Sequence, residues 1–135
     1  MAKLTEAQAS FIRDNPFYGV VTTLRPDGSP HSTVVWVTEE DGKVLFNTAY
    51  PRTKARELER DARASVVVLD PENGYRWVAV SGPVELTTDG AKADIDMLSR
   101  KYDGIDYPNH EKGESIGETR VTARLTPEKV QGYGI

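Results

Sequence analysis

The sequence of 135 residues contains no cysteine and only two histidines, His31 and His110. The lack of cysteine excludes disulfide bonds, thiolate catalysis and cysteine-ligated metal. A zinc site or a Ser-His-Asp triad would depend on these two histidines, and we therefore expect no metal site. Neither a P-loop nor a G-x-G-x-x-G pattern occurs. No residue stands out as catalytic, so an enzyme with this sequence would need a cofactor to supply its chemistry.

Long apolar runs are also missing. None approaches the roughly 18 residues that a membrane span requires, and the N-terminal MAKLTEAQASF lacks the apolar core of a secretory signal. The formal net charge of -4 argues against non-specific nucleic-acid binding, which requires a cationic surface. We therefore expect one cytoplasmic domain over residues 1–135 that binds neither nucleic acid nor membrane.

Short β-branched segments separated by tight turns predict an antiparallel protein that is mainly β with small helices, an α+β fold. The six expected strands are residues 18–24, 31–38, 44–49, 64–70, 75–86 and 119–126. Helices are expected at residues 4–14, 51–63 and 87–104, and a surface loop or short helix at 105–117. Gly82 and Pro83 indicate a bulge or bend in the fifth strand. This pattern predicts a closed or partly closed antiparallel barrel.

The second expected helix, within NTAYPRTKARELERD (residues 47–61), has its charges in an unusual order. Three cations precede three acids: Arg52, Lys54 and Arg56 come before Glu57, Glu59 and Asp61. Helix starts favour carboxylates, because the N-terminus carries positive partial charge. One interpretation is a solvated surface with ion pairs at helical spacing. The other is an anion site, typically for phosphate, formed by cations and uncapped amides where a strand end meets a helix start; the acids then only balance the charge.

Other candidate residues have two interpretations as well. His31 is either a surface residue beside a turn or part of a site. Trp77 and Tyr75 could stack on a planar ligand, although core or interface packing is the simpler account of Trp77. Asp94 and Asp96 are typical of a solvated helix face.

The order of segments at residues 20–37, 41–70, 75–86 and 119–134 resembles the pyridoxamine 5'-phosphate oxidase-like split β-barrel superfamily. The most specific part is PRTKAREL followed by DARASVVV, and the resemblance is greatest to the branch that uses the deazaflavin coenzyme F420. It implies a six-stranded antiparallel split β-barrel of the FMN-binding type. It also implies a homodimer with cofactor sites at the interface.

The resemblance implies twelve cofactor-binding residues. Arg52, Thr53 and Lys54 match the phosphate position, and Arg56 is placed to meet the anionic oligoglutamate tail. The remaining residues would line the planar ring or the ribityl chain: His31, Ser32, Thr33, Val34, Val35, Asn47, Thr48 and, from either subunit, Trp77. FMN-dependent relatives carry an additional Arg and Lys in the second strand. Ser32 and Val37 stand there in this chain, which favours F420 over FMN.

The implied activity is that of an F420-dependent reductase, an oxidoreductase that transfers hydride from the reduced coenzyme to an unsaturated small-molecule substrate. A non-catalytic F420-binding or carrier protein is one alternative. An FMN-binding reductase or oxidase of the same fold is another.

Overall fold

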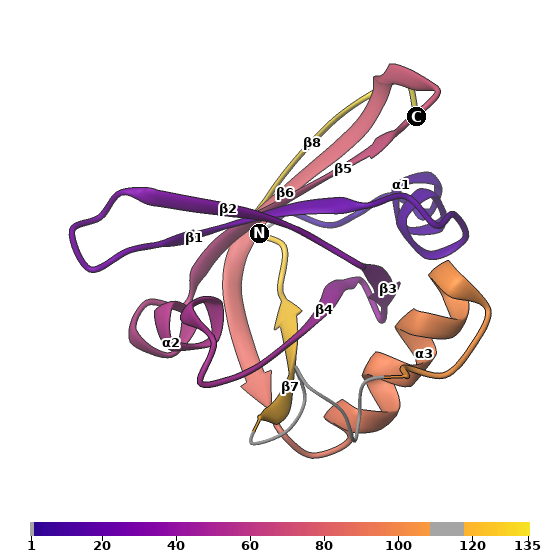
Figure 1. Ribbon diagram of the computed structural model, residues 1–135. Helices are drawn as coiled ribbons and strands as arrows, with labels where there is room; N and C mark the ends of the chain where they lie inside the picture. Colours follow the sequence, from indigo (N-terminus) through magenta and orange to yellow (C-terminus); the bar gives the residue numbers. More distant parts are fainter. Residues whose placement is uncertain (1, 109–117) are drawn as a thin grey trace.

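The computed structural model describes residues 2–108 and 118–135 (Figure 1). Most of the expected loop at 105–117, including His110, therefore lies outside the described residues. The helices are α1 (Glu6–Arg13), α2 (Thr53–Arg60) and α3 (Ala91–Asp103). The strands are β1 (Gly19–Leu24), β2 (Pro30–Val35), β3 (Thr38–Glu40), β4 (Lys43–Tyr50), β5 (Arg63–Asp70), β6 (Asn73–Thr87), β7 (Thr119–Leu125) and β8 (Lys129–Tyr133).

All strand pairs in the described part of the chain are antiparallel, as the turn pattern predicted. The strand order is β2-β1-β5-β6-β7-β4-β3, and β8 pairs with β6 beside this path. The predicted α+β class is confirmed, and the fold is of the split-barrel kind. The predicted count of six strands is wrong: the described residues form eight, and their sheet is not closed.

The two additional strands have separate origins. The expected strand at 31–38 is divided into β2 and β3 because side chains of α3 bind the backbone of Val37. The Val37 N–H donates to the Tyr102 hydroxyl at 3.1 Å, and Lys101 Nζ donates to the Val37 carbonyl at 2.6 Å. Strand β8 is a short, largely exposed edge strand that lacks a clear apolar alternation, so the sequence pattern did not indicate it.

Strand β6 joins the two halves of the sheet. Its residues from Trp77 to Pro83 pair with β5, and those from Val84 onward pair with β7. At the change of partner, a Cβ on Gly82 would lie 1.9 Å from the Thr126 carbonyl oxygen. Glycine is therefore required here by close backbone approach, and β6 continues through Gly82–Pro83 as one strand of 15 residues.

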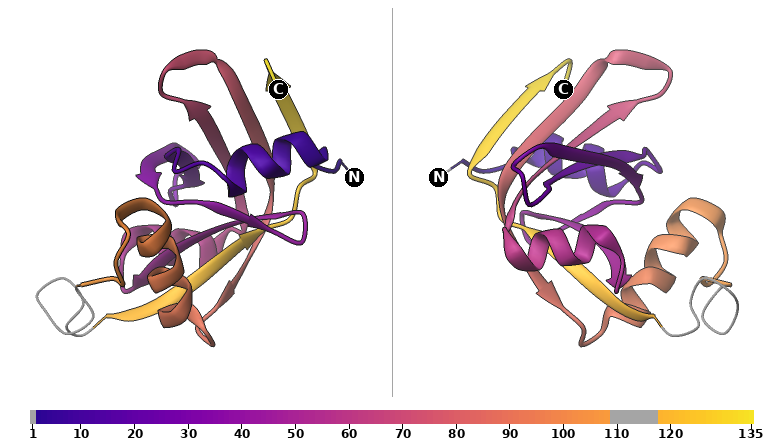
Figure 2. Two further views of the ribbon diagram at one scale, coloured as in Figure 1. Left: turned by 90° about the vertical axis from the view of Figure 1, so that its right-hand side faces the viewer. Right: turned by 60° about the vertical axis from the view of Figure 1, so that its left-hand side comes forward.

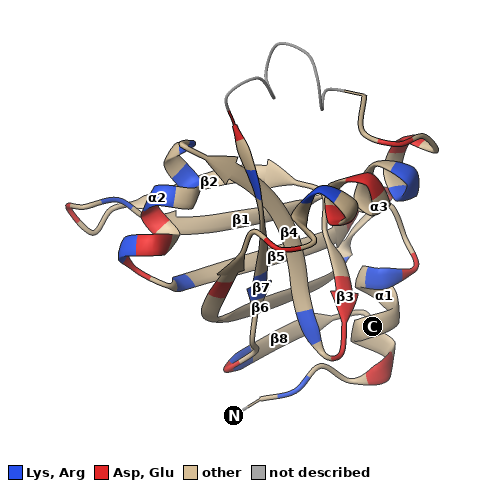
Figure 3. Cartoon of the chain, turned by 90° about the horizontal axis from the view of Figure 1, so that it is seen from below, with Lys and Arg blue, Asp and Glu red and all other residues tan. Residues whose placement is uncertain are grey.

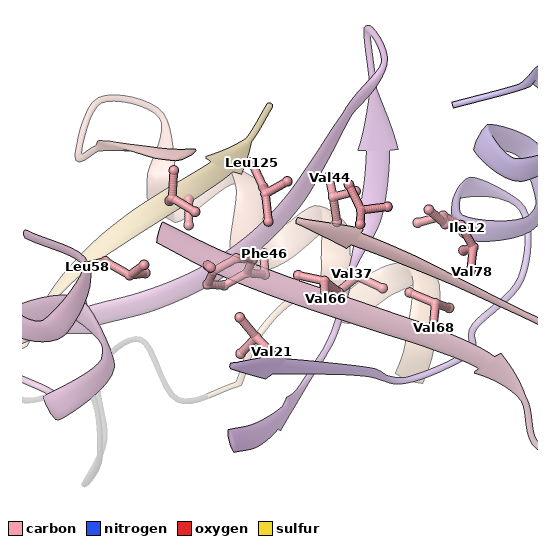
Figure 4. Close-up of a cluster of buried hydrophobic side chains, with 14 of the residues drawn as sticks. Ile12, Val21, Val37, Val44, Phe46, Leu58, Val66, Val68, Val78 and Leu125 are labelled. Carbon is pink, nitrogen blue, oxygen red and sulfur yellow. The ribbon is translucent and has the colours of Figure 1, made fainter. Parts of the chain in front are cut away.

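The core fills the space between the two halves of the sheet. Phe46 lies near its centre, with Val21, Val66 and Leu125 around it, all fully or almost fully buried (Figure 4). Leu58 brings α2 into the same cluster. Strands β1 and β5 alternate buried and partly exposed residues, so one face of these strands packs on the core and the other faces outward.

The helices pack at the margins of the sheet (Figures 1 and 2). Helix α1 begins with a capping box formed by Thr5 and Gln8. Helix α2 packs against β1 and β4, and α3 packs against β7 and β4. Within residues 2–108 and 118–135, no helix is long and apolar enough to cross a membrane.

Substitution of Gly82 by Ala should destabilise the protein by about 1–3 kcal/mol, because the methyl group would overlap backbone that cannot move independently. Gly74→Ala, in the same strand but with open space at its Cβ, should change stability by less than about 0.5 kcal/mol. Urea unfolding of both variants measures the difference. Equal effects of the two substitutions would contradict the requirement for glycine at position 82, where β6 changes its partner strand.

Candidate functional site

Two adjoining cavities lie where β2, β4 and the start of α2 meet. The larger has a volume of about 440 Å³ and extends toward α3 and β7. The smaller has a volume of about 200 Å³ and lies between β2, β4 and α2. Asn47, Arg52 and Lys54 line both cavities. These three residues therefore form a shared polar wall.

The local sequence explains why amides and cations gather at this wall. Strand β4 ends at Tyr50, and α2 begins at Thr53 after only two residues. Arg52 is the N-cap residue, but its side chain makes no capping hydrogen bond, and the first turn contains no acid. The start of α2 thus keeps its positive partial charge beside the smaller cavity.

Lys54 is one of the two cations that line both cavities. Burial, together with the positive charges of Arg52 and Arg120, lowers the pKa of Lys54 to about 8. Its ammonium group is still mostly charged at neutral pH. A half-buried cation near two other cations favours an anion in the adjoining space. The interpretation of Lys54 as a solvated surface residue is therefore not supported.

Arg52 differs from Lys54 because it already has a carboxylate partner. Its Nε and Nη2 atoms donate to the two oxygens of Glu118 at 2.5 and 2.9 Å. This bidentate pair lowers the pKa of Glu118, chiefly through the hydrogen bond from Arg52. Arg52 thus contributes less unbalanced charge to the cavities than its position in the sequence suggested.

A hydrogen-bond network fixes Asn47. Its Nδ2 donates to the Ala91 carbonyl at 2.9 Å, and its Oδ1 accepts from Arg120 Nε at 2.8 Å. Arg120 lines the larger cavity, and its buried Nη1 has no hydrogen-bond partner among the described residues. Thr122 donates to Asp94 at 2.6 Å, so Asp94 is a structural acceptor and not the solvated acid that the sequence indicated. Asp96 likewise accepts from the backbone N–H of Tyr107 at 2.9 Å.

Aromatic rings form another wall of the larger cavity. Trp36 stacks on Tyr102 with centroids 5.6 Å apart and contacts Tyr107 edge-on at 6.4 Å. Tyr18 continues the group, 5.5 Å from Tyr102. Trp36, Tyr107 and Tyr18 line the cavity, so a planar ligand could contact aromatic surface there.

His31 and Glu57 meet at the smaller cavity. His31 Nδ1 lies 2.7 Å from Glu57 Oε1, and the Thr23 hydroxyl donates to the same oxygen at 2.8 Å. Glu57 is only 3% exposed. Burial would raise the pKa of Glu57, but its hydrogen bonds with His31 and Thr23 outweigh that effect and lower the pKa. The interpretation of Glu57 as an acid that only balances helix charge is wrong.

The structure brings together nine of the twelve residues implied by the resemblance. Seven line the smaller cavity: His31, Thr33, Asn47, Thr48, Arg52, Thr53 and Lys54. Val34 and Val35 line the larger one. Ser32 faces outward and bonds to Thr22 at 2.8 Å, Arg56 is exposed, and Trp77 lies on β6 opposite Tyr133 of β8. These last three residues line neither cavity, and the cofactor-binding roles of all twelve residues stay predictions.

Sequence reasoning missed Arg120, Trp36, Tyr107 and Glu57 as residues of this region. Arg120 stands among apolar residues of β7, and only the fold shows that α3 packs against this strand. Trp77 and the 77%-exposed Tyr75 were considered for stacking, and Trp36 was not. Tyr107 lies eleven residues from Asp96, and only the fold brings it to the cavity.

The sheet is an open, antiparallel split barrel, and a cationic cavity lies where β4 meets α2. These two features place the protein in the split-barrel class. A family model described as pyridoxamine 5'-phosphate oxidase matches residues 4–134. The chain therefore belongs to the pyridoxamine 5'-phosphate oxidase family, as the sequence motifs predicted.

Solved structures agree with this assignment. The chain is similar to a protein named F420 reductase, with 27% sequence identity, a TM-score of 0.79, and coverage of 95% of this chain and 98% of that one. It shares its fold with a conserved hypothetical protein from Mycobacterium tuberculosis, at 24% identity and a TM-score of 0.76, covering 96% and 84% of the two chains. A candidate pyridoxamine 5'-phosphate oxidase from Listeria innocua has the same fold at 16% identity, a TM-score of 0.67, and coverage of 91% and 92%.

We expect Lys54 to titrate near pH 8, protonated below that value and neutral above it. Arg52→Gln should raise this pKa, because it removes a neighbouring positive charge and leaves the Glu118 carboxylate without its partner. NMR titration of ¹³C-methylated lysines, with Lys54→Ala to identify the signal, measures both values. Titration near the ordinary lysine pKa of about 10.4 would contradict the burial of this ammonium group.

Proposed function

We propose that this protein is an F420-dependent oxidoreductase that reduces an unsaturated small-molecule substrate. The observation that carries the proposal is the half-buried Lys54, whose charge lies between a phosphate-sized cavity and a larger aromatic one. The similarity along nearly the whole chain to a protein named F420 reductase supports the choice of coenzyme.

The residues present fit a phosphate-bearing, planar cofactor. The smaller cavity offers Lys54, the uncapped start of α2 and the Thr33 hydroxyl, whose buried oxygen has no hydrogen-bond partner in the described chain. The larger cavity offers aromatic surface at Trp36, and an unpaired guanidinium nitrogen of Arg120 is buried at its wall. Buried polar groups without partners are unfavourable by about 1–3 kcal/mol each, which favours a ligand that satisfies them.

When bound, a reduced deazaflavin supplies a hydride equivalent. The chain's own residues then have three tasks. Lys54 and the start of α2 hold the phosphate, Val34 and Val35 present a strand edge and apolar surface, and Trp36 helps to exclude water from the larger cavity. The proton that completes a reduction would come from solvent or a nearby hydroxyl, and no side chain is assigned that role.

We also propose a homodimer, formed through the outward face of β1, β2, β5, β6 and β8. One row across this face is almost entirely apolar: Val34, Val20, Val67, Ala79 and Gln131. The neighbouring row of cross-strand residues has four hydroxyl side chains and one cation: Ser32, Thr22, Ser65, Ser81 and Lys129. Strands β1 and β2 contain no acid, lysine or arginine (Figure 3). A flat, nearly uncharged face favours a second copy of the chain, and it would place Trp77 at the interface.

The cofactor proposal predicts micromolar or tighter binding of oxidised F420. Lys54→Ala should weaken this binding at least about tenfold, because a charge-assisted phosphate contact is lost. Quenching of tryptophan fluorescence measures the affinity. Lys43→Ala, which removes the same charge at the start of β4 outside both cavities, should change it less than about twofold.

The same titration separates the alternatives. Tight FMN binding without saturable F420 quenching would contradict the choice of coenzyme and favour an FMN-dependent reductase or oxidase. If F420 binds but its reduced form is never oxidised by a panel of unsaturated acceptors under anaerobic conditions, the carrier alternative is favoured over the enzyme.

The homodimer proposal predicts that light scattering after size exclusion gives the mass of two chains. Val67→Lys should shift this mass to that of one chain, since it introduces charges at the centre of the outward face. Thr88→Lys, at an exposed position beyond the end of β6, should leave the mass unchanged. A wild-type protein with the mass of one chain would contradict the dimer.

A further inference from the structure

His31 and Glu57 form a partly buried ionisable pair that the proposed hydride transfer does not use. Glu57 projects from α2 toward the face of the β1–β2 pair, where Thr23 and His31 are direct cross-strand partners. The side chains of Thr23 and His31 both converge on one carboxylate oxygen of Glu57. Such convergence fixes the imidazole far more firmly than a solvent-exposed pair would.

The orientation of the ring follows from these contacts. Because Glu57 is a carboxylate at neutral pH, its partner nitrogen, His31 Nδ1, must carry a proton. Nε2 is then the nitrogen available to a ligand. His31 lines the smaller cavity together with Lys54 and Thr33, so that ligand would lie near the Lys54 ammonium group and the Thr33 hydroxyl.

The volume of the smaller cavity limits its occupant. At about 200 Å³ it holds a phosphate-sized group with a few waters, since each water occupies about 30 Å³. It adjoins the larger cavity through Asn47, Arg52 and Lys54, so the anionic group of a longer ligand could sit here while its ring occupies the larger space.

We propose that His31, positioned by Glu57, is a proton-linked ligand for the anionic group in the smaller cavity. Binding of the anion draws a proton from solvent onto Nε2, and the resulting N–H donates to the anion. Glu57 offsets the new positive charge. This inference rests on the proposed function only in taking the anion to be the phosphate of the cofactor.

The charges around His31 determine the direction of the pH effect. Helix α2 and its N-cap contribute Glu57, Lys54 and Arg52, while Arg25 follows β1 and acts on Glu57. Strand β4 contributes the uncharged Asn47 and Thr48. The Glu118 carboxylate bonds to Arg52. Among the described residues, Glu57 is the one carboxylate that bonds directly to the His31 ring.

Imidazoles change charge between pH 5 and 8. A protonated His31 ring donates from Nε2 and attracts the anion, whereas the Nε2 lone pair of the neutral ring opposes the anion. Affinity should therefore fall as pH rises through this range. Lys54 stays mostly charged until about pH 8, so its own loss of affinity comes later and at higher pH.

Sulfate is the appropriate probe, because its charge is constant over this range and it does not require the coenzyme. Sulfate binding to the full chain should weaken at least about fivefold between pH 6.0 and 7.5, measured by NMR titration. In His31→Gln the same change should be less than about twofold, with residual binding through Lys54. With only two histidines in the chain, the ¹⁵N signals of His31 are identified by their loss in this variant.

The ¹⁵N shifts also test the positioning role directly. Neutral His31 in the wild type should carry its proton on Nδ1, and sulfate should shift Nε2 toward the protonated value. A folded Glu57→Gln variant should lose the Nδ1-H preference and the pH dependence. If Glu57→Gln does not fold, the tautomer of His31 in the wild type and the pH dependence of sulfate binding in His31→Gln still test the proposal.

Several outcomes would overturn the proposal. These are equal pH dependence in wild type and His31→Gln, a wild-type tautomer with the proton on Nε2, or no saturable sulfate binding at pH 6.0. Failure of F420 to bind, with proton-linked sulfate binding intact, would contradict the cofactor assignment alone. Binding of F420 that is independent of both pH and His31 would contradict this inference alone.

Discussion

Strand β6 passes through both halves of the sheet, and this continuity depends on the contact of Gly82 with the Thr126 carbonyl. The first half of β6 pairs with β5, which pairs with β1, and β1 pairs with β2. The second half of β6 pairs with β7, which pairs with β4. The candidate site is built from β2 on one side and from β4, β7 and α2 on the other. Its two walls are therefore held in register by a single backbone, and small errors at the crossing would change the spacing between them.

Electrostatics at the start of α2 distinguish three cations that look alike in the sequence. Arg52 is neutralised by Glu118, Lys54 is half-buried between two cavities, and Arg56 is exposed to solvent. The reversed order of charges therefore has one specific consequence, the uncompensated charge of Lys54. The acids that follow are not equivalent either, because Glu57 is buried and bonded to His31, whereas Glu59 is exposed.

Local patterns predicted most of the fold but only part of the site. The turn pattern predicted the antiparallel pairing, the β-branched segment at residues 18–24 contains β1, and the expected helix at residues 87–104 contains α3. The break at Val37 could not be predicted, since it depends on side chains more than 60 residues away. Arg120 and Trp36 were missed for a similar reason: alternation shows which face a residue occupies, but not which helix covers that face.

Lys54 also links occupancy of the site to the stability of the whole chain. Folding moves this ammonium group from water into a partly buried place beside other cations, so its charged form is less favourable in the folded state than in the unfolded one. An anion that binds only the folded state offsets this unfavourable term and adds its own binding free energy. The melting temperature of the purified protein is thus a direct reporter of occupancy, and it allows a search for ligands that does not depend on knowing the reaction.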